Sequence, residues 1–157
     1  MSRSNSVSAT PFEAHITDLG HDGRGVARIE GKTVFVSGGL LGETVMAKLR
    51  KRHRHFDEAE VVEVITASPH RVEPRCQHFA QCSGCSLQHL DAPSQITAKQ
   101  RVLAENFERI GKVTPQTWLP PLTAEPWGYR RKGRLSVRNV AKKGRVLVGF
   151  REEQNPR

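Results

Sequence analysis

The feature that most limits the fold of this chain is a series of short segments between residues 12 and 66 in which apolar and polar residues alternate. Glycine-containing turns separate them, and such alternation is typical of strands with one buried face. Five strands this close together predict a small closed or nearly closed barrel of the OB type, because closure removes the exposed edges of the sheet. An open meander is the alternative. The predicted strands are 12–20, 26–29, 33–36, 43–53 and 58–68.

One helix is predicted after the barrel. Apolar residues recur at helical spacing from Ile96 to Ile110. Asp91 stands where an N-cap belongs, Pro93 would occupy the first turn, and Gly111 stands where a C-terminal cap belongs. The fold class is therefore mainly β with one helix.

The last predicted element is a β-hairpin formed by residues 133–140 and 145–152 around a turn at Ala141–Gly144. An isolated two-stranded hairpin is only marginally stable in water. We therefore expect another part of the protein to pair with it or cover it, which indicates that the chain is a fragment. The alternative is that it folds back on the cysteine loop or the helix.

The composition favours a polyanionic partner. The chain has 25 Lys and Arg against 16 Asp and Glu, a net charge of +9, which suits RNA, DNA or an anionic membrane surface. The first eleven residues contain no apolar run and are expected to be a disordered lead, not a signal peptide. No segment has the roughly 18 apolar residues that cross a bilayer. We therefore expect a soluble, cytoplasmic protein.

Three cysteines, Cys76, Cys82 and Cys85, are clustered in a loop-like stretch at residues 69–92. An odd number this close together favours metal ligation over disulfides. Three thiolates are one ligand short of either a structural zinc site or a [4Fe–4S] cluster.

The cysteine spacing alone does not distinguish a zinc site from an iron–sulfur site. His78 or His89 would complete a Cys3His zinc site, and a fourth cysteine beyond residue 157 would complete an iron–sulfur site. Three buried thiols without a metal are a further alternative.

Two basic segments are candidates for RNA contact, because cations bind phosphate while a neighbouring aromatic ring stacks on an unpaired base. The first is expected to be a long loop between two barrel strands, and the second leads into the hairpin. A solvated charged face is the alternative for each. The candidate residues are Lys48, Arg50, Lys51, Arg52 and Arg54 in the first segment, and Tyr129, Arg130, Arg131, Lys132 and Arg134 in the second.

Four stretches together resemble a known family. Residues 16–49 resemble a TRAM domain, a small RNA-binding barrel, and the motif CQHFAQCSGCSLQHL at 76–90 resembles the iron–sulfur signature of bacterial 23S rRNA (uracil(1939)-C(5))-methyltransferases. Residues 126–132 and 148–156 are similar to the central β region of that family. The cysteine motif is the most specific part, since the TRAM pattern also occurs in tRNA-modifying enzymes.

The resemblance implies a function and cofactors. The three cysteines would ligate a [4Fe–4S] cluster with a fourth cysteine that follows the hairpin, beyond Arg157. S-adenosylmethionine, the nucleophile and the general base would belong to a C-terminal Rossmann-type domain that this sequence does not contain. The chain alone is therefore expected to be inactive. Its expected partner is a single-stranded or looped segment of 23S rRNA, bound by a monomer and without a membrane.

The expected organisation has four parts: a lead at 1–11, a TRAM barrel at 12–67, a cysteine loop at 68–92, and the start of a truncated central domain at 93–157. A stand-alone RNA-binding module with a structural Cys3His zinc site is the alternative function. A membrane-surface binder is disfavoured, because the predicted helix carries mixed charge instead of one basic face.

Overall fold

The computed structural model describes residues 10–152. Most of the predicted disordered lead, at 1–9, and the end of the predicted central domain, at 153–157, lie outside the described residues. No helix in the described part is long and apolar enough to cross a membrane.

The chain divides into two compact units. The first runs to Val72 and also includes His89–Thr114. The second comprises Glu73–Gln88 and the chain from Pro115 onward. The predicted domain boundaries stay predictions, and each unit is described by itself below.

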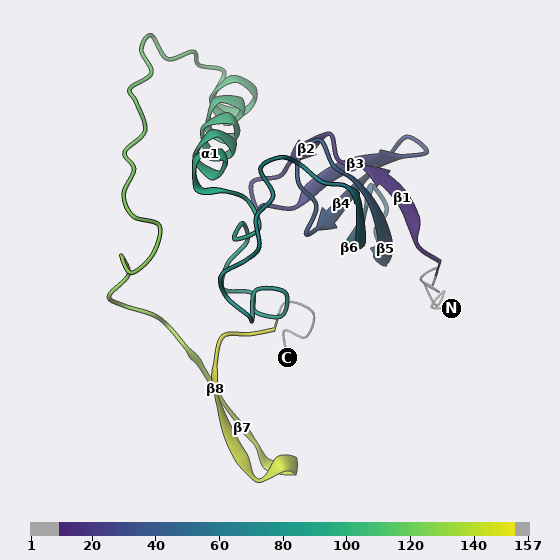
Figure 1. Ribbon diagram of the computed structural model, residues 1–157, viewed down its shortest axis with the longest axis vertical. Helices are drawn as coiled ribbons and strands as arrows, with labels where there is room; N and C mark the ends of the chain where they lie inside the picture. Colours follow the sequence, from purple (N-terminus) through teal and green to yellow (C-terminus); the bar gives the residue numbers. More distant parts are fainter. Residues whose placement is uncertain (1–9, 153–157) are drawn as a thin grey trace. The chain divides into compact units, whose positions relative to one another are not determined.

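The first unit is built on one six-stranded sheet. Its strands are β1 (Phe12–His15), β2 (Asp18–Leu19), β3 (Gly25–Ile29), β4 (Lys32–Ser37), β5 (Thr44–Arg52) and β6 (Phe56–Thr66). Their order across the sheet is β1-β5-β6-β4-β3-β2 (Figure 1). The pairing of β4 with β6 is parallel, and the other pairs are antiparallel.

The sheet curls into a nearly closed barrel. β1 and β2 are its two edges, yet only Ile16 and Thr17 separate them along the chain. The Ile16 amide donates to the Glu43 carbonyl and the Thr17 amide to the Val26 carbonyl, each at 2.8 Å. One continuous segment therefore pairs with β5 at its start and β3 at its end. The predicted OB-like barrel is confirmed, but its expected first strand is two strands, because the chain turns there from one edge to the other.

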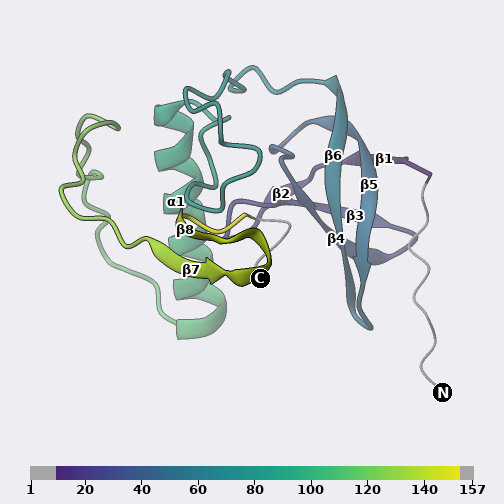
Figure 2. The same cartoon turned by 90° about the horizontal axis from the view of Figure 1, so that it is seen from below.

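The curl of the sheet depends on irregular pairing between its two longest strands. β5 and β6 shift register at three places, between Thr44 and Val45, Met46 and Ala47, and Leu49 and Lys51. Such bulges bend a strand and increase its twist. As a result β6 can pair with β5 on one side and β4 on the other, and in Figure 2 β5 and β6 run steeply across the direction of β1 and β3.

Alternation in the sequence places small and β-branched side chains inside the barrel. Residues on one face of each strand are buried, while their neighbours along the chain are partly exposed. β3 and β4 are joined by Glu30 and Gly31, both at positive φ, as a two-residue turn between twisted strands requires. The buried cluster consists of Ala14, Ile16, Ala27, Val34, Val36, Val45, Ala47 and Ala59.

The predicted helix is present as α1 (Ala92–Asn106). The Asp91 carboxylate accepts a hydrogen bond from the Ser94 amide at 2.7 Å, so the predicted N-cap is confirmed. Pro93 lies in the first turn, as predicted.

The end of the helix differs from the prediction. After α1 the chain forms a wider π-helical turn, Phe107–Gly111, and the left-handed residue is Lys112, at φ 52. The expectation that Gly111 caps the helix is wrong by one residue. Because the π-helical turn is wider, Gly111 is still part of the helical segment. The left-handed residue that ends the helix is Lys112, whose amide donates to the Phe107 carbonyl.

The second unit contains the predicted hairpin, formed by β7 (Ser136–Val140) and β8 (Arg145–Gly149). A 3-10 turn at Ala141–Lys143 and Gly144, at φ 59, join the strands. Val137 and Val148 lie opposite each other and are 69% and 62% exposed. The hairpin therefore has the predicted pairing, with little burial of its apolar side chains.

Candidate nucleic-acid interface and cysteine loop

The first basic segment is mostly strand. Lys48–Arg52 lie in β5, and only His53, Arg54 and His55 connect β5 to β6. The expectation of a long basic loop is therefore wrong. Lys48, Lys51 and Arg52 stand directly opposite Glu60, Glu58 and Asp57 of β6. Opposite charges on paired strands stabilise the pairing, so these cations can extend the sheet instead of leaving it.

Carboxylates of β6 form ion pairs with some of the nearby cations and not with others. Arg50 forms an ion pair with Glu60, and the Lys32 ammonium contacts Asp57 at 2.6 Å and donates to the His53 carbonyl at 2.7 Å. Among residues 10–152, Lys48, Lys51, Arg52 and Arg54 form no ion pair, and the last three are exposed. These exposed three are therefore the cations of the first segment best placed to meet a phosphate.

An aromatic row crosses the outer face of the barrel. The Phe35 and Phe56 rings meet edge to face at 5.4 Å, and His53 stacks on Phe56 at 4.3 Å. The Arg24 guanidinium lies 4.8 Å from the centre of the Phe35 ring, and Glu58 contacts both Arg24 and His53. The sequence analysis did not single out this row, although Phe35 stands between the buried Val34 and Val36 and so had to face outward.

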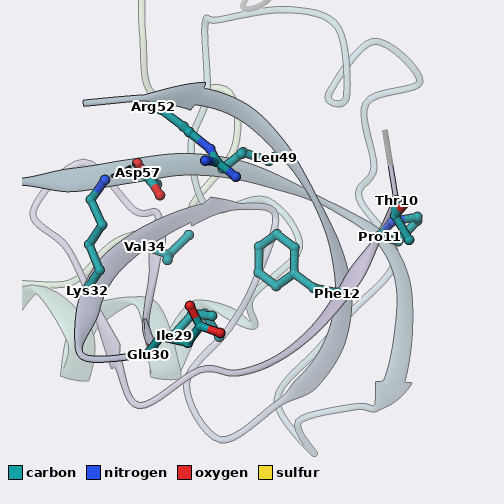
Figure 3. A pocket seen from close by; sticks show the side chains of 10 residues that line it. All are labelled: Thr10, Pro11, Phe12, Ile29, Glu30, Lys32, Val34, Leu49, Arg52 and Asp57. Carbon is teal, nitrogen blue, oxygen red and sulfur yellow. Dashed lines mark hydrogen bonds and ion pairs between the residues drawn. The ribbon is translucent and has the colours of Figure 1, made fainter. Parts of the chain in front are cut away.

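The barrel has an open mouth at the end where Lys32 and Arg52 lie. A cavity of about 540 Å³ opens there, and Figure 3 shows the Phe12 ring projecting into it from β1 with Ile29 and Val34 nearby. Leu49 completes the apolar lining, and Arg52 lies beside it. The full lining is Thr10, Pro11, Phe12, Ile29, Glu30, Lys32, Val34, Leu49, Arg52 and Asp57.

A buried ion pair ties the segment after the barrel to the sheet. The Glu43 side chain is fully buried, and the Arg71 guanidinium donates to it at 2.6 and 2.7 Å. The amides of Leu40 and Ser68 also donate to this carboxylate. Burial alone would raise the pKa of Glu43. The hydrogen bonds from Arg71 and these two amides, together with the charge of Arg71, lower it by more, so the pKa lies below its usual value.

His89, one of the two histidines considered for zinc, belongs to the first unit. It is 2% exposed. Burial, followed by the charge of Arg71, lowers the pKa of His89 to about 4, with Glu43 acting in the opposite direction. His89 is therefore neutral near pH 7, the form in which an imidazole binds a metal. Its participation in a zinc site stays a prediction.

The cysteines lie in a loop of tight turns within the second unit. The Phe79 amide donates to the Cys76 carbonyl at 3.0 Å, the Cys82 amide donates to the His78 carbonyl at 2.8 Å, and the Gly84 amide donates to the Cys82 sulfur at 3.4 Å. An amide that points at sulfur is the arrangement expected around a thiolate, so the turn suits ligation. All three thiols are free, and Cys85 is exposed.

The chain after the hairpin pairs with this loop. Ser83 donates to the Arg151 carbonyl through its amide at 3.0 Å and its hydroxyl at 2.9 Å, and Cys82 forms a β-bridge with Glu152. A Cβ built on Gly84 would lie 3.2 Å from the Cys82 sulfur and 3.7 Å from the Phe150 ring, so a larger residue would crowd both. The alternative that the hairpin region returns to the cysteine loop is thus observed for Arg151 and Glu152.

The three sulfurs do not converge. Within the described residues, no three side chains of His, Cys, Asp or Glu gather closely enough to hold a metal ion. The donor set nevertheless fits a thiolate-bound metal, because three free cysteines share one loop and a backbone amide is directed at one sulfur. The proposed ligands are therefore present and compatible in kind, and their assembly around a metal stays a prediction.

The second basic segment is exposed in the second unit. Tyr129 is 65% exposed, and the Arg130 guanidinium lies 5.7 Å from the centre of its ring. Arg75 lies 5.0 Å from the centre of the Trp127 ring, which is 46% exposed. The exposed rings and cations alternate here, as in surfaces that bind single-stranded RNA. The roles predicted for Arg131, Lys132 and Arg134 stay predictions.

Comparison with known proteins identifies one domain family and several similar proteins. Residues 10–62 match the TRAM domain family. A protein of Stenotrophomonas maltophilia (strain R551-3) is 63% identical, and the alignment covers 100% of this chain and 36% of that protein. A protein of Xanthomonas campestris pv. campestris (strain 8004) is 62% identical, with 97% and 35% covered. Both are named 23S rRNA (uracil(1939)-C(5))-methyltransferase RlmD.

One solved structure also matches part of the chain. A conserved protein of Methanococcus maripaludis, solved in solution, is 34% identical, and the match covers 38% of this chain and 87% of that one. Its TM-score of 0.34 is too low to support a likeness of fold.

The matched residues, 10–62, coincide with the strands of the barrel, so the first unit contains a TRAM domain. The similarity to the curated relatives continues through the cysteine loop, the helix and the hairpin. Over its whole length the chain is similar to relatives named as 23S rRNA (uracil(1939)-C(5))-methyltransferases, and it spans about a third of the length of these relatives.

Proposed function

We propose that this chain is the RNA-recognition portion of an enzyme that forms 5-methyluridine in 23S rRNA by methyl transfer from S-adenosylmethionine. The barrel and the two basic segments would hold a single-stranded or looped segment of the rRNA in the cytoplasm. The chain would act as a monomer. Because chemistry on a base requires that base to leave its stack, the target uridine would be presented to a separate catalytic domain.

The observation that carries this proposal is the identity of 63% across the whole chain to a relative whose name states that activity. The structure adds physical support. The exposed cations Lys51, Arg52 and Arg54 lie at one end of the TRAM barrel and form no ion pair within residues 10–152. A net charge of +9 suits a polyanion.

RNA binding by the purified chain tests the proposal. We expect tighter binding to a single-stranded oligoribonucleotide copied from the uracil-containing segment of 23S rRNA than to its duplex, with affinity that falls as salt rises, since binding releases counterions. Fluorescence anisotropy across a salt series measures both. Binding that is absent, or equal for a heparin-like polyanion and the RNA at every salt concentration, would contradict RNA recognition.

We further propose that Cys76, Cys82 and Cys85 are ligands of a [4Fe–4S] cluster. The free thiols on one loop and the amide directed at the Cys82 sulfur support the proposal. When bound, such a cluster would cross-link the loop and stabilise it. The cysteines would thus order the part of the second unit that lacks its own buried core.

Metal analysis of the chain purified without oxygen tests the ligand assignment. We expect iron and inorganic sulfide, lost in Cys82→Ser and retained in Ser86→Ala, a control in the same loop. Stoichiometric zinc without sulfide would favour the Cys3His alternative, and His78→Gln and His89→Gln would then show which histidine completes it. Full alkylation of all three thiols in native protein, with no metal, would contradict both assignments.

A further inference from the structure

We propose that the open mouth of the barrel holds one unstacked nucleobase of a single-stranded RNA, with the Phe12 ring as the stacking surface and the Arg52 guanidinium as the phosphate contact. The proposal rests on the RNA-binding function proposed above and names the place on the barrel where a strand is held. Phe12 was not among the candidate residues of the sequence analysis.

The cavity has the size and lining that a base requires. Its volume of about 540 Å³ lies in the range of small-molecule sites, which are mostly apolar with a few placed polar groups. Phe12 is partly buried, packs against the core cluster and projects into the opening (Figure 3). Leu49 and Val34, both buried, supply apolar contact. An aromatic ring at the entrance of such a cavity offers a π-face to any base, whatever its sequence.

The charges around the mouth favour a nucleotide over a neutral apolar ligand. Arg52 lies on the lining, is exposed and forms no ion pair among the residues that the structure describes. Lys51 and Arg54, which lie one and two residues from it in sequence, are exposed too. A phosphate on either side of the inserted base would therefore meet a free cation. A neutral ligand would gain nothing from these charges.

The polar groups inside the rim can contact the edge of a base. The Lys32 ammonium is held by Asp57 at 2.6 Å and by the His53 carbonyl at 2.7 Å, so its position is fixed. Asp57 also accepts from the His53 amide at 3.3 Å. This arrangement places a donor and an acceptor together at the mouth, where the Watson–Crick edge of an unpaired base presents both kinds of group. A paired base inside a duplex could not enter.

Anisotropy titration of the full chain with a short single-stranded oligoribonucleotide and with the matching duplex tests the site. Phe12→Leu keeps an apolar side chain but removes the π-face, so we expect about tenfold weaker binding to the single strand and no change for the duplex. Phe12→Trp should restore binding to within about twofold. Arg52→Ala should weaken single-strand binding, whereas Arg101→Ala on α1 is the matched control, because Asp18 and Glu105 already hold Arg101.

A measurement on the unaltered protein complements the variants, because Phe12 also touches the core. An oligoribonucleotide that carries 4-thiouridine should cross-link on irradiation to Phe12, located by mass spectrometry of the peptides. If the chain binds single-stranded RNA but Phe12→Leu binds equally tightly and no cross-link maps to Phe12, the base site is wrong while RNA binding stands. Equal losses on single strand and duplex would show that Phe12 acts only through the fold. A chain that binds no RNA would overturn the site and the proposed function together.

Discussion

The two units of the chain are stabilised by different means. Within residues 10–152, every fully buried hydrophobic side chain belongs to the first unit, and most lie inside the barrel. In the second unit, the hairpin residues Val137, Val146 and Val148 are between 59% and 69% exposed. The barrel therefore has a core of its own, whereas the described cysteine loop and hairpin bury few apolar side chains, and the proposed metal would stabilise them. This difference predicts that core mutations affect mainly the barrel and that loss of the proposed metal affects mainly the second unit.

The largest expected effect concerns the ion pair that anchors the segment after the barrel. Glu43→Ala leaves the Arg71 guanidinium beside a buried space with no counter-charge and removes the acceptor for two amides. Breaking a buried pair from one side costs about 3–5 kcal/mol. We expect a loss of that size in the free energy of unfolding, measured by urea denaturation. Glu13→Ala, at an exposed site on β1, should change it by less than about 0.5 kcal/mol.

Acid should destabilise the first unit through His89. The folded state keeps His89 neutral down to a pKa of about 4, whereas an unfolded chain protonates histidine near pH 6.5, so the unfolded state binds more protons between these values. Stability should therefore fall by on the order of 3 kcal/mol as the pH drops from about 7 to 4. His89→Gln should flatten this dependence in urea melts across pH. The exposed His55→Gln should not, and an unaltered slope in His89→Gln would contradict the assignment.

A matched pair of small truncations sharpens the contrast between the units. Ile16 is fully buried, and its side chain lies against Gly25 and Gly39, so Ile16→Val should cost about 0.5–1.5 kcal/mol. Val148→Ala on the exposed hairpin should cost less than about 0.5 kcal/mol. Thermal melts of the chain without metal would measure both. A larger effect for Val148→Ala would mean that something covers the hairpin in solution.

Strands and helix ends could be predicted from the sequence because they depend on residues that are close together in the chain. The barrel strands follow from alternation with a period of two, and the start of α1 follows from Asp91 and Pro93. The pairing of Arg50 with Glu60 was not readable, because it depends on the register between β5 and β6. The strand predicted at 43–53 already contained Lys48–Arg52 and agrees with β5, so only the loop expected for these residues was wrong.

Features made by distant contacts were also beyond the sequence analysis. Glu43 follows a Gly-rich turn and would ordinarily be expected at the surface, but it is fully buried and paired with Arg71. The cavity at the barrel mouth needs β1 and the β3–β4 turn to meet, and neither segment alone indicates it. The cysteine motif was different: its spacing and its resemblance predict the metal ligands, and this stays a prediction because the structure leaves the sulfurs apart.

The smallest expected effects compare the two basic segments as RNA contacts. Arg54 lies at the turn between β5 and β6, and Arg131 lies in the exposed segment before β7. If each neutralises one phosphate, Arg54→Ala and Arg131→Ala should each weaken RNA binding only modestly and reduce the slope of log affinity against log salt by about one. If the two cations meet different phosphates, the double variant should lose the sum of both slopes. A cation that meets no phosphate releases no counterion. If Arg54→Ala reduces the salt slope and Arg131→Ala does not, RNA contact is confined to the barrel, and the second unit has only a stabilising role.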